Sequence, residues 1–374
     1  MFKGATTMSG SAYALLAGSI YSPDSNGRLG WQCSGSPSPR PLPVLVFHGS
    51  ADLTVNPVNG QQAVRQFLQT NDLADDGLDN DMVAGKAGSP TDATLYEIGS
   101  LSKTLAGTLV ANAVLEGRLG LDDDVRSYLL GNYPNLQFQG EPIRIRHLLT
   151  HTSGLPNMLP ERANTVLEDF TEHRTPAALN TLYAGYGKTD FLRDLHSVRI
   201  QQMPGKAYAY SSAGSQLTAH ILERVYPGDY ESLLRGFFGD AAAMDGVRIV
   251  LGDAEAPRLA AGYHSDNPVP TTPMPELPWG ASGNVKATVP DMVNYLRWQL
   301  ANGPVVKESH RPLARFDDTF SVGYFWNIVS GDRLKGTYYA HHGGVPRSQC
   351  YIYIMPEQWR TDGTRHGSGG RYPA

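Results

Sequence analysis

The sequence feature that most limits the possible folds is the stretch Tyr-Glu-Ile-Gly-Ser-Leu-Ser-Lys-Thr-Leu-Ala at residues 96–106. Its order of residue types predicts a short strand, a turn at Gly99 and then a helix. The first turn of that helix carries Ser100 and Lys103. Side chains three positions apart on a helix share a face. We therefore expect a strand–turn–helix unit that holds a hydroxyl beside an amine.

The pairing of Ser100 with Lys103 suggests nucleophilic chemistry. A serine hydroxyl is a poor nucleophile until a base takes its proton. A partly desolvated lysine can be that base, and the free N–H groups of a helix N-terminus can stabilise developing negative charge. The same spacing also occurs on solvated helix faces, so the motif alone leaves both interpretations open.

Composition and charge exclude several kinds of partner. The chain has 374 residues, a formal charge of -5 and 41% hydrophobic residues, as expected of a globular protein with a buried core. It has no basic cluster, so there is no electrostatic case for nucleic-acid binding. Cys33 and Cys350 give neither a disulfide framework nor a metal-type spacing, and no motif indicates a cofactor. The oligomeric state stays open.

Membrane insertion and export are not indicated by the sequence. No apolar run approaches the ~18 residues that a membrane helix needs, so no membrane span is predicted. The first 20 residues resemble a signal peptide only weakly, because Ser and Gly dilute their apolar part and no small-x-small cleavage site follows. We expect mature protein there. The compartment stays open between the cytoplasm and a secreted or periplasmic location.

Residues 1–70 have a pattern of their own. An apolar run over residues 42–47 leads into His48-Gly-Ser-Ala-Asp52, as in a buried parallel strand with an acid at its carboxyl end. This segment resembles the C-terminal part of α/β-hydrolases of the polyhydroxybutyrate-depolymerase and feruloyl-esterase type, which implies Asp52 as a triad acid. No Gly-x-Ser-x-Gly elbow precedes it, so we favour a loop acid at Asp52.

The rest of the chain divides into three parts by composition. Residues 71–92 predict a linker, residues 93–356 predict one large domain, and residues 357–374 predict a disordered Gly/Arg-rich tail. Within the domain, we expect helices over residues 105–114 and 216–226, and another opened by the capping box Thr288-Val-Pro-Asp291. Near-alternating aromatic and β-branched residues predict strands at 320–330, 336–341 and 349–354.

Two histidines, His147 and His151, are four residues apart and could face a metal ion from a helix. The zinc-protease version of this spacing needs a glutamate beside the first histidine, and Leu148 stands there instead. We therefore predict that both histidines are structural and that the chain has no metal site.

Two further motifs fit the chemistry of Ser100 and Lys103. Tyr210-Ser-Ser212 supplies a phenol, for which we expect a lowered pKa between donor or cationic groups and a role as proton shuttle. His341-His-Gly-Gly344 lies at a predicted strand whose backbone can face the nucleophile.

The order and context of the three motifs resemble the serine β-lactamase and penicillin-recognising superfamily over residues 90–356. The branch is that of class C β-lactamases, D-Ala-D-Ala peptidases and family VIII carboxylesterases. Its characteristic stretches include Leu115-Glu-Gly-Arg-Leu-Gly-Leu-Asp-Asp123, His147 to Pro156 and Gly280-Ala-Ser-Gly. The resemblance implies the β-lactamase/transpeptidase-like α/β (α+β) fold, an antiparallel sheet flanked by helices with a helical lobe.

Residue by residue, the resemblance implies a role for each motif. Ser100 would be the acylated nucleophile, Lys103 and Tyr210 would share the general-base role, and His341 would lie beside the acyl group. Backbone N–H groups of Ser100 and Gly344 would form the oxyanion hole. The remaining substrate-binding positions would be Ser212, His342 and Gly343.

Two departures from the family pattern favour ester substrates over amides. Ser212 replaces the usual asparagine, and His341 in place of lysine removes a fixed cation for a substrate carboxylate. We therefore predict a serine hydrolase that acts on small esters. The alternatives are a D-Ala-D-Ala carboxypeptidase or β-lactamase and, from another class, a non-catalytic fused remnant or binding module.

The remnant hypothesis comes from strands that the chain lacks. Family members begin with two strands that join the sheet of the His-Gly-Gly strand, whereas only residues 91–98 match that region here. The family's last strand and C-terminal helix are also replaced by the tail. A sheet without its edge strands exposes unpaired backbone, so the domain appears clipped at both ends.

Overall fold

The computed structural model describes residues 91–168, 174–264, 267–332, 336–345 and 348–356. The chain divides into two compact units, of which one comprises Asp92–Gly262 and Thr271–Thr361. From the other unit, the described part contains the hairpin of β4 (Tyr263–His264) and β5 (Asn267–Pro270). The predictions for Asp52 and residues 1–70, for the linker up to residue 90, and for the tail at 357–374 lie outside the described residues.

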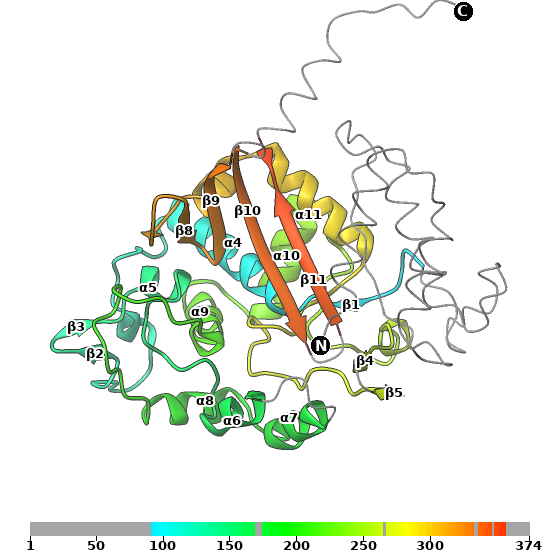
Figure 1. Cartoon of the computed structure of the whole chain (residues 1–374), viewed down its shortest axis with the longest axis horizontal. Coiled ribbons are helices and arrows are strands. Elements are labelled where there is room, and N and C mark those ends of the chain that lie inside the picture. The colour runs from blue at the N-terminus through cyan, green and yellow to red at the C-terminus, as the bar shows by residue number, and fades with distance from the viewer. Residues whose placement is uncertain (1–90, 169–173, 265–266, 333–335, 346–347, 357–374) are drawn as a thin grey trace, which may run out of the picture. The chain divides into compact units, whose positions relative to one another are not determined.

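The main sheet of the described residues is antiparallel and has five strands in the order β11-β10-β9-β8-β7 (Figure 1). These strands are β7 (Ala314–Arg315), β8 (Phe320–Gly323), β9 (Trp326–Asp332), β10 (Gly336–Val345) and β11 (Ser348–Ile354). Short pairs are formed by β1 (Tyr96–Glu97) with β6 (Lys286–Ala287), and by β2 (Gln137–Phe138) with β3 (Glu141–Pro142).

Helices flank the sheet and form a separate lobe. In Figure 1, α4, α10 and α11 lie behind the sheet, and α6, α7 and α8 lie together at the bottom of the view. The α-helices are α4 (Ser102–Leu115), α5 (Ile145–Leu149), α6 (Arg162–Leu167), α7 (Thr175–Tyr183), α8 (Lys188–Leu195), α9 (Ser212–Val225), α10 (Tyr230–Ala242), α11 (Val289–Ala301) and α12 (Pro304–Ser309). The 3₁₀ helices are η1 (Gly99–Leu101), η2 (Val125–Tyr128) and η3 (Ala256–Arg258).

Helix α4 is the centre of the unit. It packs against α9, α10 and α12, and every residue from 101 to 111 is buried. A helix that is apolar all round is stable only when other elements surround it. The sequence periodicity predicted an apolar face on this helix, whereas the structure buries nearly its whole circumference.

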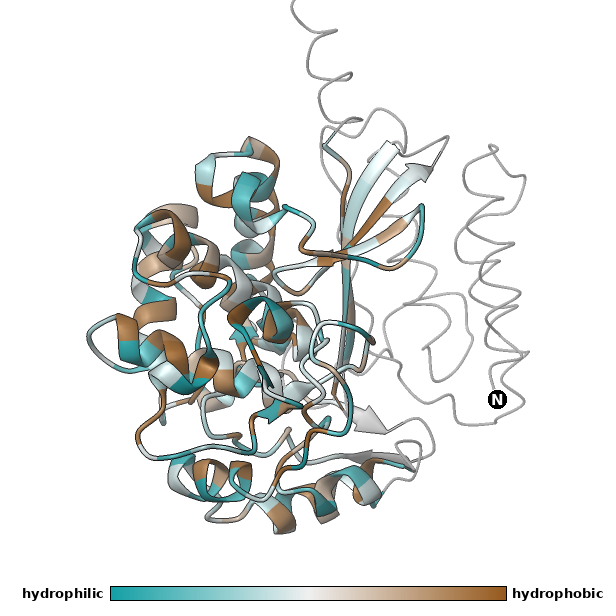
Figure 2. Cartoon of the chain, turned by 90° about the vertical axis from the view of Figure 1, so that its left-hand side faces the viewer, coloured by the Kyte–Doolittle hydropathy of each residue, from teal (hydrophilic) through white to brown (hydrophobic). Residues whose placement is uncertain are grey.

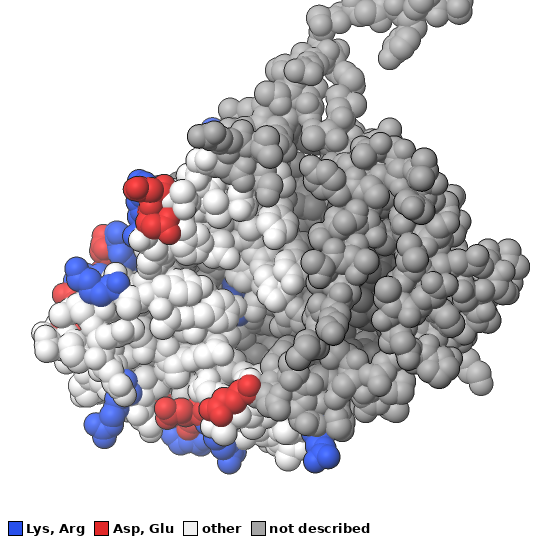
Figure 3. Space-filling view, viewed as in Figure 1, with Lys and Arg blue, Asp and Glu red and all other residues white. Residues whose placement is uncertain are grey.

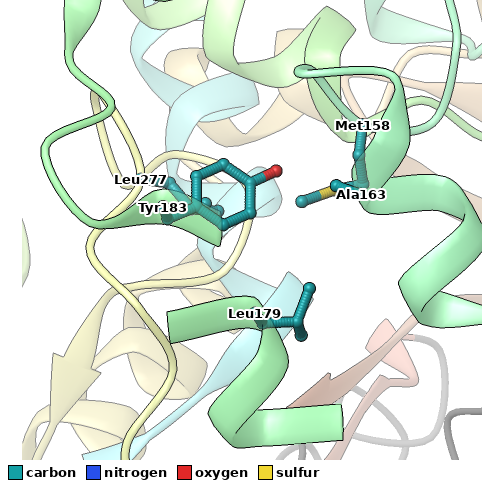
Figure 4. Close-up of a cluster of buried hydrophobic side chains, with 5 residues drawn as sticks. All are labelled: Met158, Ala163, Leu179, Tyr183 and Leu277. Atoms are coloured by element: carbon teal, nitrogen blue, oxygen red, sulfur yellow. The ribbon is translucent and has the colours of Figure 1, made fainter. Parts of the chain in front are cut away.

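Helices α8 and α10 are amphipathic, because each buries residues spaced four apart, and in Figure 2 brown and teal residues alternate along helices of the chain. A small core in the lobe consists of Met158, Ala163, Leu179, Tyr183 and Leu277 (Figure 4). The Tyr183 hydroxyl donates to the carbonyl of Leu159 at 2.9 Å, which satisfies the polar end of a buried ring. Figure 3 shows the charged side chains of the described part at its periphery in this view, around a mainly uncharged centre.

The predicted capping box is present at the start of α11. Thr288 accepts from the N–H of Asp291, and the Asp291 carboxylate accepts from the N–H of Thr288. Two N–H groups at the start of the helix are therefore satisfied by side chains. The helix ends at Ala301, where Asn302 takes a left-handed conformation.

The strand predicted over residues 320–330 is wrong in one respect, because a tight turn divides it into β8 and β9. The turn residues Tyr324 and Phe325 have φ of 50° and 68° and are buried. A two-residue hairpin turn with two positive φ angles normally contains Gly or Asn. Here packing holds the turn in place, since the Tyr324 carbonyl lies where a Cβ on Gly107 of α4 would be.

The strand expected over residues 91–98 is reduced to β1, which pairs with β6 and not with the main sheet. Within the described residues, β11 therefore has a strand partner only on its β10 side. The expectation that the early strands of the sheet are missing stays a prediction, because residues 1–90 lie outside the described part of the chain.

Backbone contact without intervening side chains joins η1 to β10. A Cβ on Gly99 would lie 2.8 Å from the nitrogen of Gly344, and Gly99 also has a φ of +53°. A Cβ on Gly343 would overlap the carbonyl oxygen of Ile98 and approach Cys350 Sγ to 2.7 Å. Glycine at these positions therefore sets how closely the turn before α4 can approach the strand.

We predict that Gly343→Ala lowers the free energy of unfolding by about 3 kcal/mol, because the methyl group must push β10 away from η1. Denaturant unfolding would measure this change. The matched control is Gly236→Ala in the interior of α10, where a Cβ meets no atom within 4 Å. The control should be more stable than the wild type by about 0.5 kcal/mol. Equal stability of Gly343→Ala and wild type would contradict this account.

Candidate active site

Ser100 and Lys103 flank the junction between η1 and α4. Ser100 is the middle residue of η1, and Lys103 follows in the first turn of α4. The predicted strand, glycine turn and helix are therefore present, and the glycine turn is the start of the 3₁₀ helix η1, which leads directly into α4. Lys103 Nζ lies 3.0 Å from Ser100 Oγ.

Tyr210 reaches the same hydroxyl from a distant part of the chain. It lies in the extended segment just before Ser211, the N-cap of α9, and its hydroxyl donates to Ser100 Oγ at 2.8 Å. Lys103 Nζ also lies 4.8 Å from the centroid of the Tyr210 ring. The Lys103 amine and the Tyr210 phenol thus both lie within hydrogen-bond distance of Ser100 Oγ, close enough to exchange a proton with it.

The Lys103 amine is buried and held by a backbone carbonyl. Its Nζ donates to the carbonyl of Ser282 at 2.6 Å, and Ser100 Oγ lies 3.4 Å from the same oxygen. Burial disfavours the charged form of the amine and lowers the pKa of Lys103 to about 7. Ser282 is a site residue that we did not predict. The signal was its place in the Gly280-Ala-Ser-Gly stretch.

The expected lowering of the Tyr210 pKa is wrong. Burial raises the pKa of the phenol above its ordinary value, and this effect exceeds the opposing hydrogen bond to Ser100. Tyr210 is consequently a neutral O–H group at neutral pH. It can relay a proton, but it is not a standing phenolate base.

A cavity of about 460 Å³ opens in front of Ser100. Its walls come from η1, the end of α5, the segment before α9, and strands β9, β10 and β11. The lining residues are Ser100, His151, Tyr208, Tyr210, Phe325, Asn327, His341, His342, Gly344 and Gln349.

His341 lies in this cavity wall as a buried, uncharged imidazole. Its Nδ1 is 2.8 Å from the carbonyl oxygen of His342. Burial, aided by the positive charge of Lys103, lowers the pKa of His341 to about 3. The histidine therefore gives a substrate no fixed positive charge at neutral pH.

The other predicted binding positions are only partly brought together. Gly344 and His342 line the cavity, and His342 stacks on Tyr351 while its Nε2 lies 2.6 Å from Gln349 Oε1. Gly343 instead packs under η1. Ser212 is the first residue of α9 and lines a separate, much smaller cavity of about 10 Å³.

His151 and the aromatic residues of the cavity were not predicted as site residues. His151 follows the end of α5 with a φ of 55°, so it and His147 do not project from one helix. Tyr208 and Phe325 add aromatic surface beside it. The sequence signal for His151 was its place in the stretch His147 to Pro156, whereas no local pattern marks Tyr208 or Phe325, which long-range folding brings to the cavity.

Among the described residues, no group of three or more His, Cys, Asp or Glu side chains could hold a metal ion. No helix in the same part of the chain has the length and apolar character to cross a membrane.

The chain is similar to known proteins in both sequence and fold. The family model described as Beta-lactamase matches residues 61–365. Protein flp of Staphylococcus aureus is 24% identical over 282 residues, which cover 72% of this chain and 52% of that protein. Esterase EstB of Burkholderia gladioli is 30% identical over 200 residues, which cover 51% of this chain and 49% of that protein. The chain spans about half the length of these curated relatives.

Two solved structures show the same fold. The β-lactamase/D-alanine carboxypeptidase of Yersinia pestis has a TM-score of 0.58 at 21% identity, covering 73% of this chain and 78% of that chain. The octameric penicillin-binding protein homologue of Pyrococcus abyssi has a TM-score of 0.57 at 23% identity, covering 72% and 61%. The β-lactamase/transpeptidase-like fold predicted from the motifs is confirmed. With most of its length matched by the family model, the chain belongs to the beta-lactamase family of serine hydrolases.

Proposed function

We propose that this protein is a carboxylesterase that hydrolyses small, uncharged esters through an acyl-enzyme on Ser100. The observation that carries the proposal is the convergence on Ser100 Oγ of the Lys103 amine at 3.0 Å and the Tyr210 hydroxyl at 2.8 Å. A nucleophile needs a base within this reach and a second group that can return the proton to the leaving group.

Acylation begins with the neutral form of Lys103. Its amine takes the Ser100 proton as Oγ attacks the ester carbonyl carbon, and the carbonyl electron pair moves onto oxygen. The Ser282 carbonyl holds Nζ in place while this happens. As the tetrahedral intermediate collapses, Tyr210 gives its proton to the departing alkoxide and recovers one from the Lys103 ammonium. The products of this step are an alcohol and the acyl-enzyme, with both side chains returned to their starting states.

The N–H groups of Ser100 and Gly344 are our proposed oxyanion hole. Both residues line the cavity, and the glycine contacts between η1 and β10 bring their backbones close together. Fixed donors of this kind stabilise the negative charge that develops on the carbonyl oxygen. In deacylation a water molecule gives a proton to Lys103 and attacks the acyl carbon. The bond from that carbon to Ser100 Oγ then breaks, Oγ takes the proton back from the Lys103 ammonium, and the acid leaves.

The charge of the cavity supports an ester rather than a β-lactam or a peptide with a free C-terminus. The residues that line it include no Lys or Arg, and His341 is neutral. A substrate carboxylate would lose its hydration there without gaining a cationic partner. Aromatic surface from Tyr208 and Phe325 favours an apolar acyl or alcohol group. The relationship to Esterase EstB adds support.

The second candidate is a β-lactamase or D-Ala-D-Ala carboxypeptidase, because a solved relative of the same fold is named for both activities. It would need the same nucleophile but a carboxylate-bearing substrate. Covalent trapping by a fluorescent penicillin without turnover of esters would favour this candidate.

We expect the wild type to hydrolyse nitrophenyl acetate and butyrate and to gain the mass of one acyl or phosphonyl group at Ser100. Ser100→Ala should lower kcat by about 10⁴-fold or more, because the nucleophile is removed. Intact-mass analysis and peptide mapping after exposure to a fluorophosphonate locate the adduct.

Ser102→Ala is the matched control, since Ser102 lies two residues further along but donates to the carbonyl of Gly99 and does not line the cavity. It should still be labelled at Ser100. Equal esterase activity in wild type and Ser100→Ala would contradict the proposal. A folded wild-type protein that the fluorophosphonate does not label would favour the non-catalytic alternative.

The rate of Ser100 phosphonylation should depend on the protonation of Lys103. Because the base must be neutral, the rate should rise about tenfold per pH unit up to about pH 7, the pKa of Lys103, and level off above it. His341, with a pKa of about 3, does not titrate in this range. Stopped-flow labelling between pH 5 and pH 9 measures the profile. A flat profile would exclude Lys103 as the base.

A further inference from the structure

His151 occupies an unusual position beside the nucleophile. It lies just beyond α5 in a left-handed conformation, with a φ of 55°, and only 2% of its surface is exposed. Its side chain lines the same cavity as Ser100. The segment that it packs against, residues 208–211, belongs to no helix or strand.

Three contacts of His151 reach three consecutive residues centred on Tyr210. The His151 carbonyl accepts from the N–H of Ala209 at 2.7 Å. Its Nδ1 accepts from the N–H of Ser211 at 3.1 Å. Between these two hydrogen bonds, the imidazole packs on the Tyr210 ring with centroids 4.4 Å apart and an interplanar angle of 36°. One residue thus holds the backbone on both sides of Tyr210 and the face of its ring.

The tautomer of His151 follows from these contacts. Because Nδ1 accepts a hydrogen bond, the proton of the neutral ring is on Nε2. That nitrogen is buried and has no partner in the described part of the chain. Burial and the nearby Lys103 and His341 hold the pKa of His151 well below its usual range. An unpartnered buried N–H is unfavourable, so hydrogen bonding by Nε2 does not account for a histidine here.

We propose that His151 is the positioning residue that holds the Tyr210 phenol within hydrogen-bond distance of Ser100 Oγ. This inference rests on the proposed function, in which Tyr210 relays the proton. A shift of about 1 Å in a proton-relay group is enough to lower a rate by about 100-fold. His151 acts through Tyr210, so its contribution should disappear when the phenol is absent.

The main test is a double-mutant cycle between His151→Ala and Tyr210→Phe, read as the rate of Ser100 acylation by a nitrophenyl ester. His151→Ala should lower kcat about 100-fold, with KM within about twofold of the wild type. In the Tyr210→Phe background the same substitution should change the rate by less than about threefold, because the two residues act as one unit. Equal losses in both backgrounds would overturn the proposal.

Two further variants separate positioning from folding. His151→Asn keeps a side-chain oxygen close to the position of Nδ1 and tolerates a positive φ, so it should recover at least about tenfold of the activity lost in His151→Ala. His147→Asn is the matched control, since His147 is also buried and its Nδ1 accepts from the N–H of Arg144 at 3.1 Å, but it does not line the cavity. It should leave kcat within about twofold. A 100-fold loss in this control would overturn the assignment to His151.

A measurement without turnover distinguishes failure of this inference from failure of the proposed function. Site-specific 3-fluorotyrosine at position 210 should give one narrow ¹⁹F resonance in the wild type and in His147→Asn. It should broaden or split in His151→Ala, because the ring is no longer held in one position. An unchanged resonance would overturn the positioning role. An inactive wild type whose resonance responds as expected would overturn the esterase assignment alone.

Discussion

The interaction on which the site depends is the buried hydrogen bond from Lys103 to the carbonyl of Ser282. It brings a long flexible amine to one place beside Ser100 and removes it from water at the same time. The surrounding structure makes this possible, because α4 is enclosed by α9, α10 and α12. A lysine on an exposed helix would keep both its mobility and its ordinary pKa, and it would be a poor base at neutral pH.

A second constraint joins the turn that carries Ser100 to the sheet. Main-chain atoms of η1 and β10 approach each other directly at Gly99, Gly343 and Gly344. The same approach places Ser100 and Gly344 together in the wall of the cavity. The helix and the sheet are therefore not independent supports of the site. Displacement of the strand would move the proposed oxyanion hole relative to Ser100. Gly343 has no left-handed φ, so the close approach of the Ile98 carbonyl is what requires glycine there.

The sequence was most informative where the physics is local. Ser100 and Lys103 share a helical turn, and the capping box at Thr288 is confined to four residues. Contacts between distant segments could not be derived in this way, so the partnership of Lys103 with Ser282 and that of His151 with Tyr210 were missed. The hairpin turn at residues 324–325 was missed because tertiary packing, not turn chemistry, holds its positive φ angles.

Burial also explains why the pKa of Tyr210 was predicted with the wrong sign. From the sequence, nearby donors and cations were expected to stabilise a phenolate, but desolvation acts in the opposite direction and is larger. The same desolvation makes Lys103 a base near neutral pH and keeps His151 and His341 uncharged. One physical cause therefore shifts the pKa values of Lys103, His151, Tyr210 and His341 together. In the esterase that we propose, the same dry cavity would also disfavour an anionic substrate that meets no cationic partner there, whereas an uncharged ester would avoid that cost.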